Sequence, residues 1–597
     1  MLVAAAAWLP APKLQRANEN PQGGPAGALA ASPVVTPARW RDIASMRRPP
    51  GFHGPFRTDE TARALYSEGA GVFRIVPAAV AVPEGIDDLV ALVGWARGTG
   101  TPLVPRGAGS GMAGGNVGPG VVVDLTGGFA EPPVVDPAGR TARAGAATVY
   151  QKLNEAAGHH GLFLPPDPAS GKFCTLGGMV STNASGPHAL KHGAVRGWVR
   201  ALEFVTADGE IGRVGEGSHG STDAPPHGRT DAEGRCVGGV LPEVLRELPA
   251  LAAAVPRTSK NSSGYDLPAW ARSGHTSDLL VGSEGTLVIV TAVEVALAPL
   301  PSRRTTLLVA LRSLDDVGPA VLALLTLRPA ALELLDRTYL DFVRAEAHRP
   351  LPERTEAVLL VEFEGEADGA AAAEAVRGVA AATERADDPA AVERLWELRH
   401  MASPILARMP DETRSLQLVE DGCVPVRRLG AYVAALRETA RRHGFGVVIF
   451  GHAGDGHLHA NIIADVRAPD LVQRLAACLD ETTAVQLSLG GTPAAEHGDG
   501  RLRAPYLART FGERYAALCR KVKEAWDPAG ILNPGVVVSA PGARPLDLPL
   551  KVGLAAPRIP QHVADELRRI ERDAAWGGNL LGLAPWPDPC SLPPPTR

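Results

Sequence analysis

Three glycine-rich loops between short apolar strands, all within about 190 residues, constrain this fold more than any other feature of the sequence. They lie in PLVPRGAGSGMAGGNVGPGVVVDLT (102–126), in the segment 164–210 and in LLVGSEGTLVIVTAVEV (279–295). Glycine permits positive φ and close approach to the backbone, and successive N–H groups can form a concave anion site. A single loop of this kind could also be a long surface turn. Three loops together are hard to explain as turns, and they favour a site for the pyrophosphate of a dinucleotide.

The loops do not match the pattern typical of NAD-binding proteins. The first loop is not GxGxxG, and no single helix clearly follows it. A βαβ unit with the dinucleotide fingerprint requires both features. The sequence therefore disfavours an NAD-type domain.

Composition excludes several classes of protein. The 597 residues are 45% hydrophobic and 21% charged, which is typical of a globular chain of several domains. The net charge of −5 lacks the basic excess of a dedicated nucleic-acid binder, and no apolar run is long enough to span a bilayer. The six cysteines include no CxxC pair, so we expect neither an iron–sulfur cluster nor a cysteine-bound zinc ion. Scattered thiols fit a reducing compartment.

Changes in composition and periodicity divide the chain into five expected parts. Alternating short strands and turns give way to longer strands and amphipathic helices near residue 300. We expect strands at 357–365 and 446–452, and helices at 370–386 and 429–444. The expected parts are a disordered N-terminal arm (1–38), a first domain (39–300, with an insertion at about 211–256), a second α+β domain (301–505), a helical segment (506–540) and a Pro-rich extension with one short helix (541–597).

Histidines and an acid group in the second domain suggest a metal site. GVVIFGHAGDGHLHANI (446–462) carries His452 after an apolar strand, then His457 and His459 at i, i+2 on the next strand. The motif AAEHGDG supplies Glu496 and His497. Two imidazoles and a carboxylate suit zinc, manganese or iron(II) and leave room for a substrate. A strand turn with solvated histidines is the alternative, which we would favour for a lone HxH.

Together, the three loops resemble the FAD-binding domain of flavoproteins of the vanillyl-alcohol oxidase and p-cresol methylhydroxylase type. The resemblance implies an α+β fold, with a two-subdomain FAD-binding domain and an α+β cap domain that contains an antiparallel sheet. The first loop lacks the histidine through which some relatives attach FAD, so we expect noncovalent FAD. The resemblance assigns the following residues to the cofactor: Pro105, Arg106, Gly107, Ala108, Gly109, Ser110, Gly114, Gly115, Asn116, Pro166, Asp167, Gly177, Gly178, Ser181, Asn183, Ala184, Ser185, Gly186, Gly193, Gly282, Glu284, Gly285 and Asn533.

The histidine motifs are similar to those of one branch of this superfamily, the D-lactate dehydrogenases, glycolate oxidase flavin subunits and D-2-hydroxyglutarate dehydrogenases. The resemblance implies a divalent metal at His452, His459 and Glu496, and a catalytic base at His497. It places Arg399 at the substrate carboxylate. Two further residues are expected near the substrate: Ser403, and His457, which stands where the branch usually has Asn.

The implied reaction is oxidation of a D-2-hydroxy acid to the 2-oxo acid, with hydride transfer to flavin N5. The electron acceptor would be a quinone, a cytochrome or a separate iron–sulfur subunit, and the protein would be cytoplasmic or peripheral to the inner face of the membrane. Two alternatives stay open. One is a flavin subunit that needs an iron–sulfur partner, because EDGCVP and EHGDGRLRAP resemble enzymes fused to such a domain. The other is an enzyme like alkylglycerone-phosphate synthase.

Overall fold

The computed structural model describes residues 46–215, 240–347, 354–365, 369–573, 575–578 and 580–582. The expected N-terminal arm, the centre of the expected insertion and the last residues of the extension lie outside the described residues. Within the described ranges, no helix is both long and apolar enough to cross a membrane. The α+β fold class is confirmed, and the strands form separate sheets that are described in turn.

A small sheet carries the first glycine loop. Its strand order is β1 (Phe56–Arg57), β2 (Ala79–Ala81), β4 (Val121–Asp124) and β3 (Leu103–Arg106), with β2, β4 and β3 parallel. On one face the sheet packs against helix α2 (Ile86–Thr99), which ends at Gly100 in the left-handed conformation (φ +67°). The first glycine loop joins β3 to β4 and therefore starts at the carboxyl end of a buried parallel strand.

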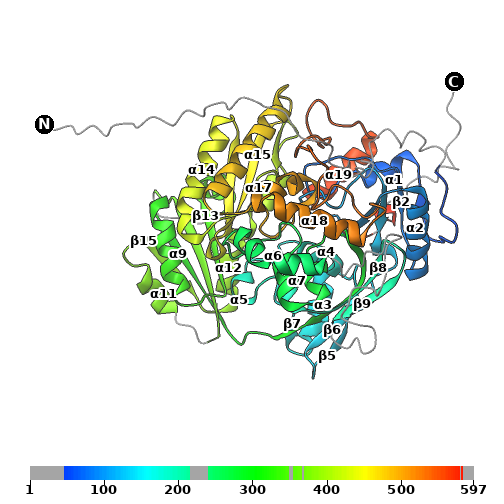
Figure 1. The fold of residues 1–597 in the computed structure, drawn as a ribbon. Helices are drawn as coiled ribbons and strands as arrows, with labels where there is room; N and C mark the ends of the chain where they lie inside the picture. The colour runs from blue at the N-terminus through cyan, green and yellow to red at the C-terminus, as the bar shows by residue number, and fades with distance from the viewer. Residues whose placement is uncertain are drawn as a thin grey trace, which may run out of the picture. The chain divides into compact units, whose positions relative to one another are not determined.

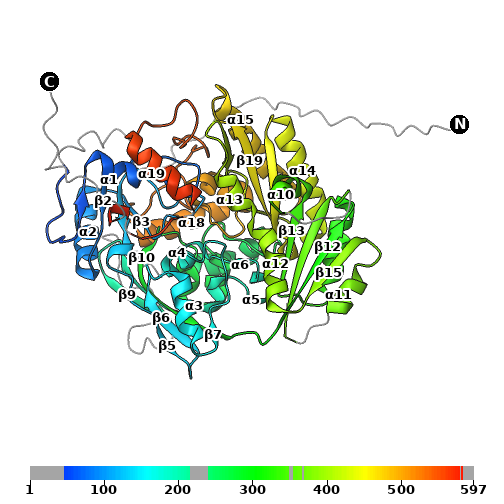
Figure 2. The same ribbon diagram turned by 180° about the vertical axis from the view of Figure 1, so that it is seen from behind.

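The other face of the small sheet is covered by the two ends of the described chain. Helix α1 (Glu60–Leu65) and helix α19 (Gln561–Arg572) lie side by side (Figures 1 and 2). Val563, Leu567 and Ile570 of α19 are buried against this sheet with Trp576. The expected helix in the extension is confirmed, and the extension packs into the core.

A second, antiparallel sheet carries the other two loops. Its order is β5 (Val134–Asp136), β6 (Thr141–Gly145), β10 (Val288–Ala296), β8 (Val199–Thr206) and β9 (Ile211–Gly215). The following helices belong to the surrounding core: α3 (Tyr150–Gly158), α4 (Leu176–Thr182), α6 (Leu241–Ala254), α7 (Leu267–Ser273), α8 (Thr276–Leu280), α17 (Leu507–Phe511) and α18 (Glu513–Trp526). Strand β9 and helix α6 lie within the expected insertion, so both described flanks of that segment are regular elements.

The largest sheet carries the histidine motifs. Its path is β15 (Ala380–Ala386), β12 (Arg304–Leu311), β14 (Ala357–Glu364), β13 (Ala331–Asp336), β18 (Gly446–His452), β19 (His457–Asp465) and β16 (Thr413–Leu416), and β17 (Gly422–Cys423) also pairs with β19. Every pairing in this sheet is antiparallel. Helices α9 (Val317–Leu325), α14 (Leu429–Arg442) and α15 (Leu471–Ser488) contribute to the core on one side, and α10 (Arg337–Ala347), α12 (Pro389–His400) and α13 (Ala402–Ala407) to the core on the other (Figures 1 and 2).

One expected helix is only partly present. The expected helix 370–386 is helical as α11 (Gly369–Ala375), but Ala380–Ala386 forms the edge strand β15, paired with β12. The Ala-rich sequence favours a helix locally. Pairing of seven residues with a neighbouring strand outweighs that weak preference, and Gly378 lies between the two elements. The expected strands 357–365 and 446–452 and the expected helix 429–444 are confirmed within two residues.

Candidate active site

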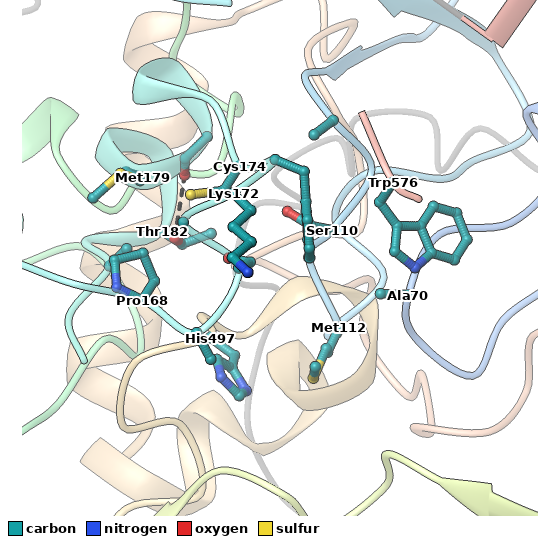
Figure 3. Close-up of a pocket in the computed structure, with 18 of the residues that line it drawn as sticks. Ala70, Ser110, Met112, Pro168, Lys172, Cys174, Met179, Thr182, His497 and Trp576 are labelled. Atoms are coloured by element: carbon teal, nitrogen blue, oxygen red, sulfur yellow. Dashed lines mark hydrogen bonds between the residues drawn. The ribbon is translucent and has the colours of Figure 1, made fainter. Parts of the chain in front are cut away.

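A cavity of about 1300 Å³ brings the glycine loops and the histidine motifs together. Figure 3 shows Ser110, Lys172, His497 and Trp576 around this space. The expected cofactor residues that line it are Pro105, Arg106, Gly107, Ala108, Gly109, Ser110, Gly115, Asn116, Asp167, Gly177, Gly178, Ser181, Ala184, Ser185, Glu284 and Gly285. The others do not line it: Gly114, Pro166, Asn183, Gly186, Gly193, Gly282 and Asn533.

The first glycine loop forms a narrow cradle against the cavity. Gly109 and Gly114 have φ of +76° and +80°. A Cβ at Gly107 would lie 2.3 Å from Thr175 Oγ1, and one at Gly114 would lie 2.5 Å from the ring of Phe73. The loop therefore approaches its neighbours more closely than any side chain would permit.

Arg106 and Asn116 leave polar atoms without partners in this cradle. Arg106 is buried and donates a hydrogen bond to the carbonyl of Glu68 (2.7 Å), but its Nη2 has no hydrogen-bond partner among the described residues. Asn116 Oδ1 is also buried without one. Such atoms are costly to bury unless a ligand pairs with them. A buried guanidinium N–H beside open backbone N–H groups suits a phosphate.

The third loop ties the cradle to the histidine motifs. Glu284 has φ +52°, and its carboxylate accepts hydrogen bonds from the backbone N–H groups of Asp499 (2.8 Å) and Gly500. Asn533 Nδ2 donates to the carbonyls of Gly115 (2.8 Å) and Glu284 (2.9 Å). Asn533 therefore holds two of the loops in position although it does not line the cavity.

Two histidines and one carboxylate converge at the opposite wall. The β18–β19 hairpin pairs His452 with His457, as expected for a strand–turn–strand segment. The Nε2 atoms of His452 and His459 lie 3.3 Å apart, and Glu496 Oε1 lies 3.4 Å and 3.7 Å from them. These separations match what ligands about 2 Å from a shared ion would show.

The far nitrogen of each histidine is held by an acceptor. His452 Nδ1 donates to Glu333 Oε1 (2.6 Å), and His459 Nδ1 donates to the carbonyl of Glu420 (2.8 Å). These bonds leave both Nε2 atoms directed at the shared space, the usual arrangement for metal-binding histidines. Burial alone would raise the pKa of Glu333, but His452 and Arg399 outweigh it and bring the pKa to about 2.

Glu496 is fixed through its second oxygen. Its Oε2 accepts hydrogen bonds from Ser185 Oγ (2.6 Å) and from the buried Lys260 Nζ (3.0 Å). Burial opposes ionisation of Glu496, but Lys260 and His452 outweigh that effect and hold its pKa well below the usual value. Ser185, expected at the cofactor, thus contacts both the cavity and the acid group.

His497 lies beside this cluster and is oriented by acids. Its Nδ1 donates to Glu420 Oε2 (2.9 Å), whose other oxygen accepts from Arg503 (2.5 Å), and its Nε2 lies 3.5 Å from Glu496 Oε1. Burial would lower the pKa of His497, but Asp421 and Glu420 outweigh it and raise the pKa well above the usual value. A protonated imidazole cannot accept a proton, so the raised pKa opposes the role of base that the resemblance implies.

Arg399 lines the cavity from helix α12. Its Nε donates to Glu333 Oε2 (2.7 Å), and its guanidinium carbon lies 4.6 Å from the centre of the Phe450 ring. Glu333 therefore joins Arg399 and His452. Ser403 is among the residues whose side chains are not described. His457 does not line the cavity: it is fully buried, although it, His452, His459 and Glu496 each offer one ligand atom within 4.8 Å of the others.

Sequence reasoning missed several residues at the site. Glu333 carries a signal, since an acid within the apolar strand segment ALELLD needs a partner when buried. Asn461 lies within the histidine motif, two positions after His459 and on the same face of β19. Glu420 lies in the motif EDGCVP, to which no role at the site was assigned. Other cavity residues that were not predicted include His188, Arg414, Gln417 and Trp576.

Comparisons with known proteins place both halves of the chain in known families. Residues 77–215 match a family of FAD binding domains, and residues 300–537 match the C-terminal domain of FAD linked oxidases. The chain is 31% identical over 494 residues to the glycolate oxidase subunit GlcD of Bacillus subtilis, covering 81% of this chain and 94% of the relative. It is 30% identical to the D-lactate dehydrogenase of Archaeoglobus fulgidus, covering 81% and 95%.

A longer relative matches in part, and two solved structures share the fold. The D-2-hydroxyglutarate dehydrogenase of Pseudomonas putida is 30% identical, and the match covers 86% of this chain but 54% of the relative. 4-Ethylphenol oxidase from Gulosibacter chungangensis superimposes with a TM-score of 0.58 at 15% identity, over 82% of this chain and 94% of that one. An alkyldihydroxyacetonephosphate synthase gives 0.53 at 16%, over 80% and 82%.

Proposed function

This chain belongs to the family of FAD-linked oxidases, and from that premise we propose that it oxidises a D-2-hydroxy acid to the 2-oxo acid. The observation that carries the proposal is the single cavity that the glycine cradle shares with His452, His459, Glu496 and His497. The named activities of the relatives, on glycolate, D-lactate and D-2-hydroxyglutarate, support this substrate class. The members of this class share a carboxylate next to a carbon that bears a hydroxyl group.

The cradle fits noncovalent FAD. Arg106 Nη2 and the open N–H groups of residues 107–116 would pair with the pyrophosphate. Thr175 and Phe73 leave no space for a Cβ at Gly107 and Gly114, so the loop keeps the compact backbone shape in which Gly107, Gly109 and Gly115 line the cavity. When bound, FAD supplies the acceptor for the hydride that leaves C2 of the substrate.

The donor set at His452, His459 and Glu496 fits a divalent metal such as zinc, manganese or iron(II). A bound cation would polarise the substrate and lower the pKa of its hydroxyl group. The positive charge there would also oppose the raised pKa of His497 and favour the neutral form of its imidazole.

The protein's own residues would orient the substrate and receive its proton. Arg399 would pair with the carboxylate, with Glu333 fixing the plane of the guanidinium through Nε. His497 would take the hydroxyl proton at Nε2, since its Nδ1–H is already donated to Glu420. Arg503 balances part of the charge of Glu420, because the two groups form a buried ion pair.

Anaerobic reduction of the flavin tests the proposal. The full chain loaded with FAD is mixed with D-lactate, glycolate or D-2-hydroxyglutarate, and with the L-enantiomers of the chiral acids as controls. We expect at least one D-acid or glycolate to bleach the flavin absorbance, and EDTA to slow the reaction until zinc, manganese or iron(II) is added back. Bleaching by dithionite but by none of the acids would contradict the proposal.

A second candidate is a subunit that passes its electrons to an iron–sulfur partner. It is favoured by the name of the Bacillus subtilis relative, a subunit of glycolate oxidase. The cysteines in the described part of the chain are buried and unpaired and offer no cluster site of their own. If the isolated chain reduces an artificial dye but no quinone, the partner hypothesis is favoured over direct use of a quinone.

A further inference from the structure

We propose that His457 is a fourth protein ligand of the divalent cation, in addition to His452, His459 and Glu496. The inference rests on the metal site of the proposed function. It assigns to this chain a set of three imidazoles and one carboxylate in place of two imidazoles and one carboxylate. In the family that the sequence resembles, the position of His457 usually carries Asn, so the fourth ligand would distinguish this chain.

The hairpin geometry brings the third imidazole to the cluster. His457 is paired with His452 across the β18–β19 turn, which is tightened by Gly456 in a left-handed conformation (φ +72°). The centre of its ring lies 4.5 Å from that of His459 and 5.1 Å from that of His452. One nitrogen of His457 lies within 4.8 Å of the ligand atoms of the other three residues.

The bonding of His457 is incomplete. Its side chain is fully buried, and neither ring nitrogen makes a well-aligned hydrogen bond to any residue that the structure describes. Nδ1 lies 3.8 Å from Glu496 Oε2, a distance at which no hydrogen bond forms. A buried ring nitrogen without a partner destabilises a protein, and a cation beside Nδ1 would remove that penalty.

The carboxylate of Asp421 lies beside the other ring nitrogen of His457. His457 Nε2 lies 3.0 Å from Asp421 Oδ1, and Asp421 is itself fixed by the backbone N–H groups of Ala495, Glu496 and His497. Metal-binding histidines commonly have a carboxylate at the nitrogen remote from the metal. Asp421 would thus favour the tautomer with a proton on Nε2 and a free lone pair on Nδ1.

Lys260 defines which oxygen of Glu496 remains for the cation. Its ammonium group bonds Oε2 (3.0 Å) and lies 3.5 Å from Asp455 Oδ2, so Oε1 is the oxygen left toward His452 and His459. A third nitrogen donor would favour zinc, iron or cobalt over manganese, since imidazole suits the former metals and oxygen donors suit manganese.

The test compares metal binding in the full chain, two variants of His457 and one control variant. Each protein is stripped with a chelator and titrated with Zn²⁺, Mn²⁺ and Co²⁺ against a competing chelator. We expect His457→Ala to bind Zn²⁺ at least about 10-fold more weakly than the unmodified chain. His457→Asn, which supplies an amide oxygen, should lose affinity for Zn²⁺ but not for Mn²⁺. His443→Asn is the matched control. His443 follows the end of α14, bonds Glu481 of α15 and does not line the cavity.

A spectroscopic measurement on the unmodified chain does not depend on how well the variants fold. X-ray absorption of the Zn²⁺-loaded, unmodified chain should count three bound imidazoles, and His457→Asn should remove one of them while FAD remains bound. Equal Zn²⁺ affinity and an equal imidazole count in both proteins would overturn the fourth ligand and leave the metal site standing. An unmodified chain that binds no stoichiometric metal would overturn the metal site and the inference together.

Discussion

The two walls of the cavity are built from different parts of the polypeptide. On the side of residues 105–116, backbone groups face the cavity, and the glycines there have positive φ or no space for a Cβ. On the side of the large sheet, the wall is formed by the side chains of Arg399, His452, His459, Glu496 and His497. Binding at the first wall depends mainly on the shape of the backbone, and binding at the second depends mainly on charged side chains. A substitution in the first should affect cofactor binding, whereas one in the second should affect chemistry with FAD still bound.

The largest effect is expected from His497→Gln. Loss of a general base slows proton transfer by about 10²–10⁴-fold, and the glycine cradle is not altered. Anaerobic stopped-flow reduction with the best substrate should show this loss, while the ratio of flavin to protein stays at that of the unmodified chain. Fast reduction in the variant would contradict the assignment of the base.

A histidine that joins the two walls should give the protein a pH-dependent stability. His188 bonds Asp167 (2.6 Å) in the second glycine-rich segment and Glu362 (2.9 Å) on β14. Burial alone would lower the pKa of His188, but Asp167 and Glu362 outweigh it and raise the pKa to about 10. The stabilisation is therefore complete below pH 6.5 and is lost as the pH rises from there through about 10.

We expect the free energy of unfolding to fall by up to about 5 kcal/mol across that range. His188→Gln should be less stable than the unmodified chain at pH 6 and equal to it near pH 10. Urea unfolding followed by tryptophan fluorescence at several pH values measures the difference. A constant difference between the two proteins across the range would show that His188 is not charged at neutral pH.

Gly114→Ala tests the wall that depends on shape. Alanine would have to adopt φ near +80°, which costs about 1–3 kcal/mol of stability. Its Cβ would also overlap the ring of Phe73. We expect the variant to purify with less FAD, measured by the flavin absorbance per protein and by FAD titration. The control is Gly94→Ala within α2, where a Cβ meets open space, so FAD binding should be unchanged.

The smallest effect is expected from Arg399→Lys. Lysine keeps the positive charge but loses the planar fork that binds a carboxylate through two bonds. We expect KM for the hydroxy acid to rise about 10-fold, corresponding to about 1.4 kcal/mol, with FAD content unchanged. An unchanged KM would show that Arg399 serves only to hold Glu333.

Local motifs predicted part of each wall, because a cradle of glycines and a pair of histidines two residues apart are visible in short windows. The bonds that hold these residues were not predictable in the same way. Glu333 meets His452 across 119 positions and Lys260 meets Glu496 across 236, and no local pattern encodes such distances. Strand β15 was missed because sheet pairing, and not composition, determines its state.

The contacts of Asn533 join residues that are translated at very different times. Its side chain bonds the carbonyl of Gly115, which precedes it by 418 positions, and its backbone N–H bonds the carbonyl of Leu103 at the start of β3. A ribosome therefore releases the first glycine loop long before the residue that fixes it has been translated. These two contacts can form only after translation has passed residue 533, so the final anchoring of the loop is a late event in the synthesis of the chain.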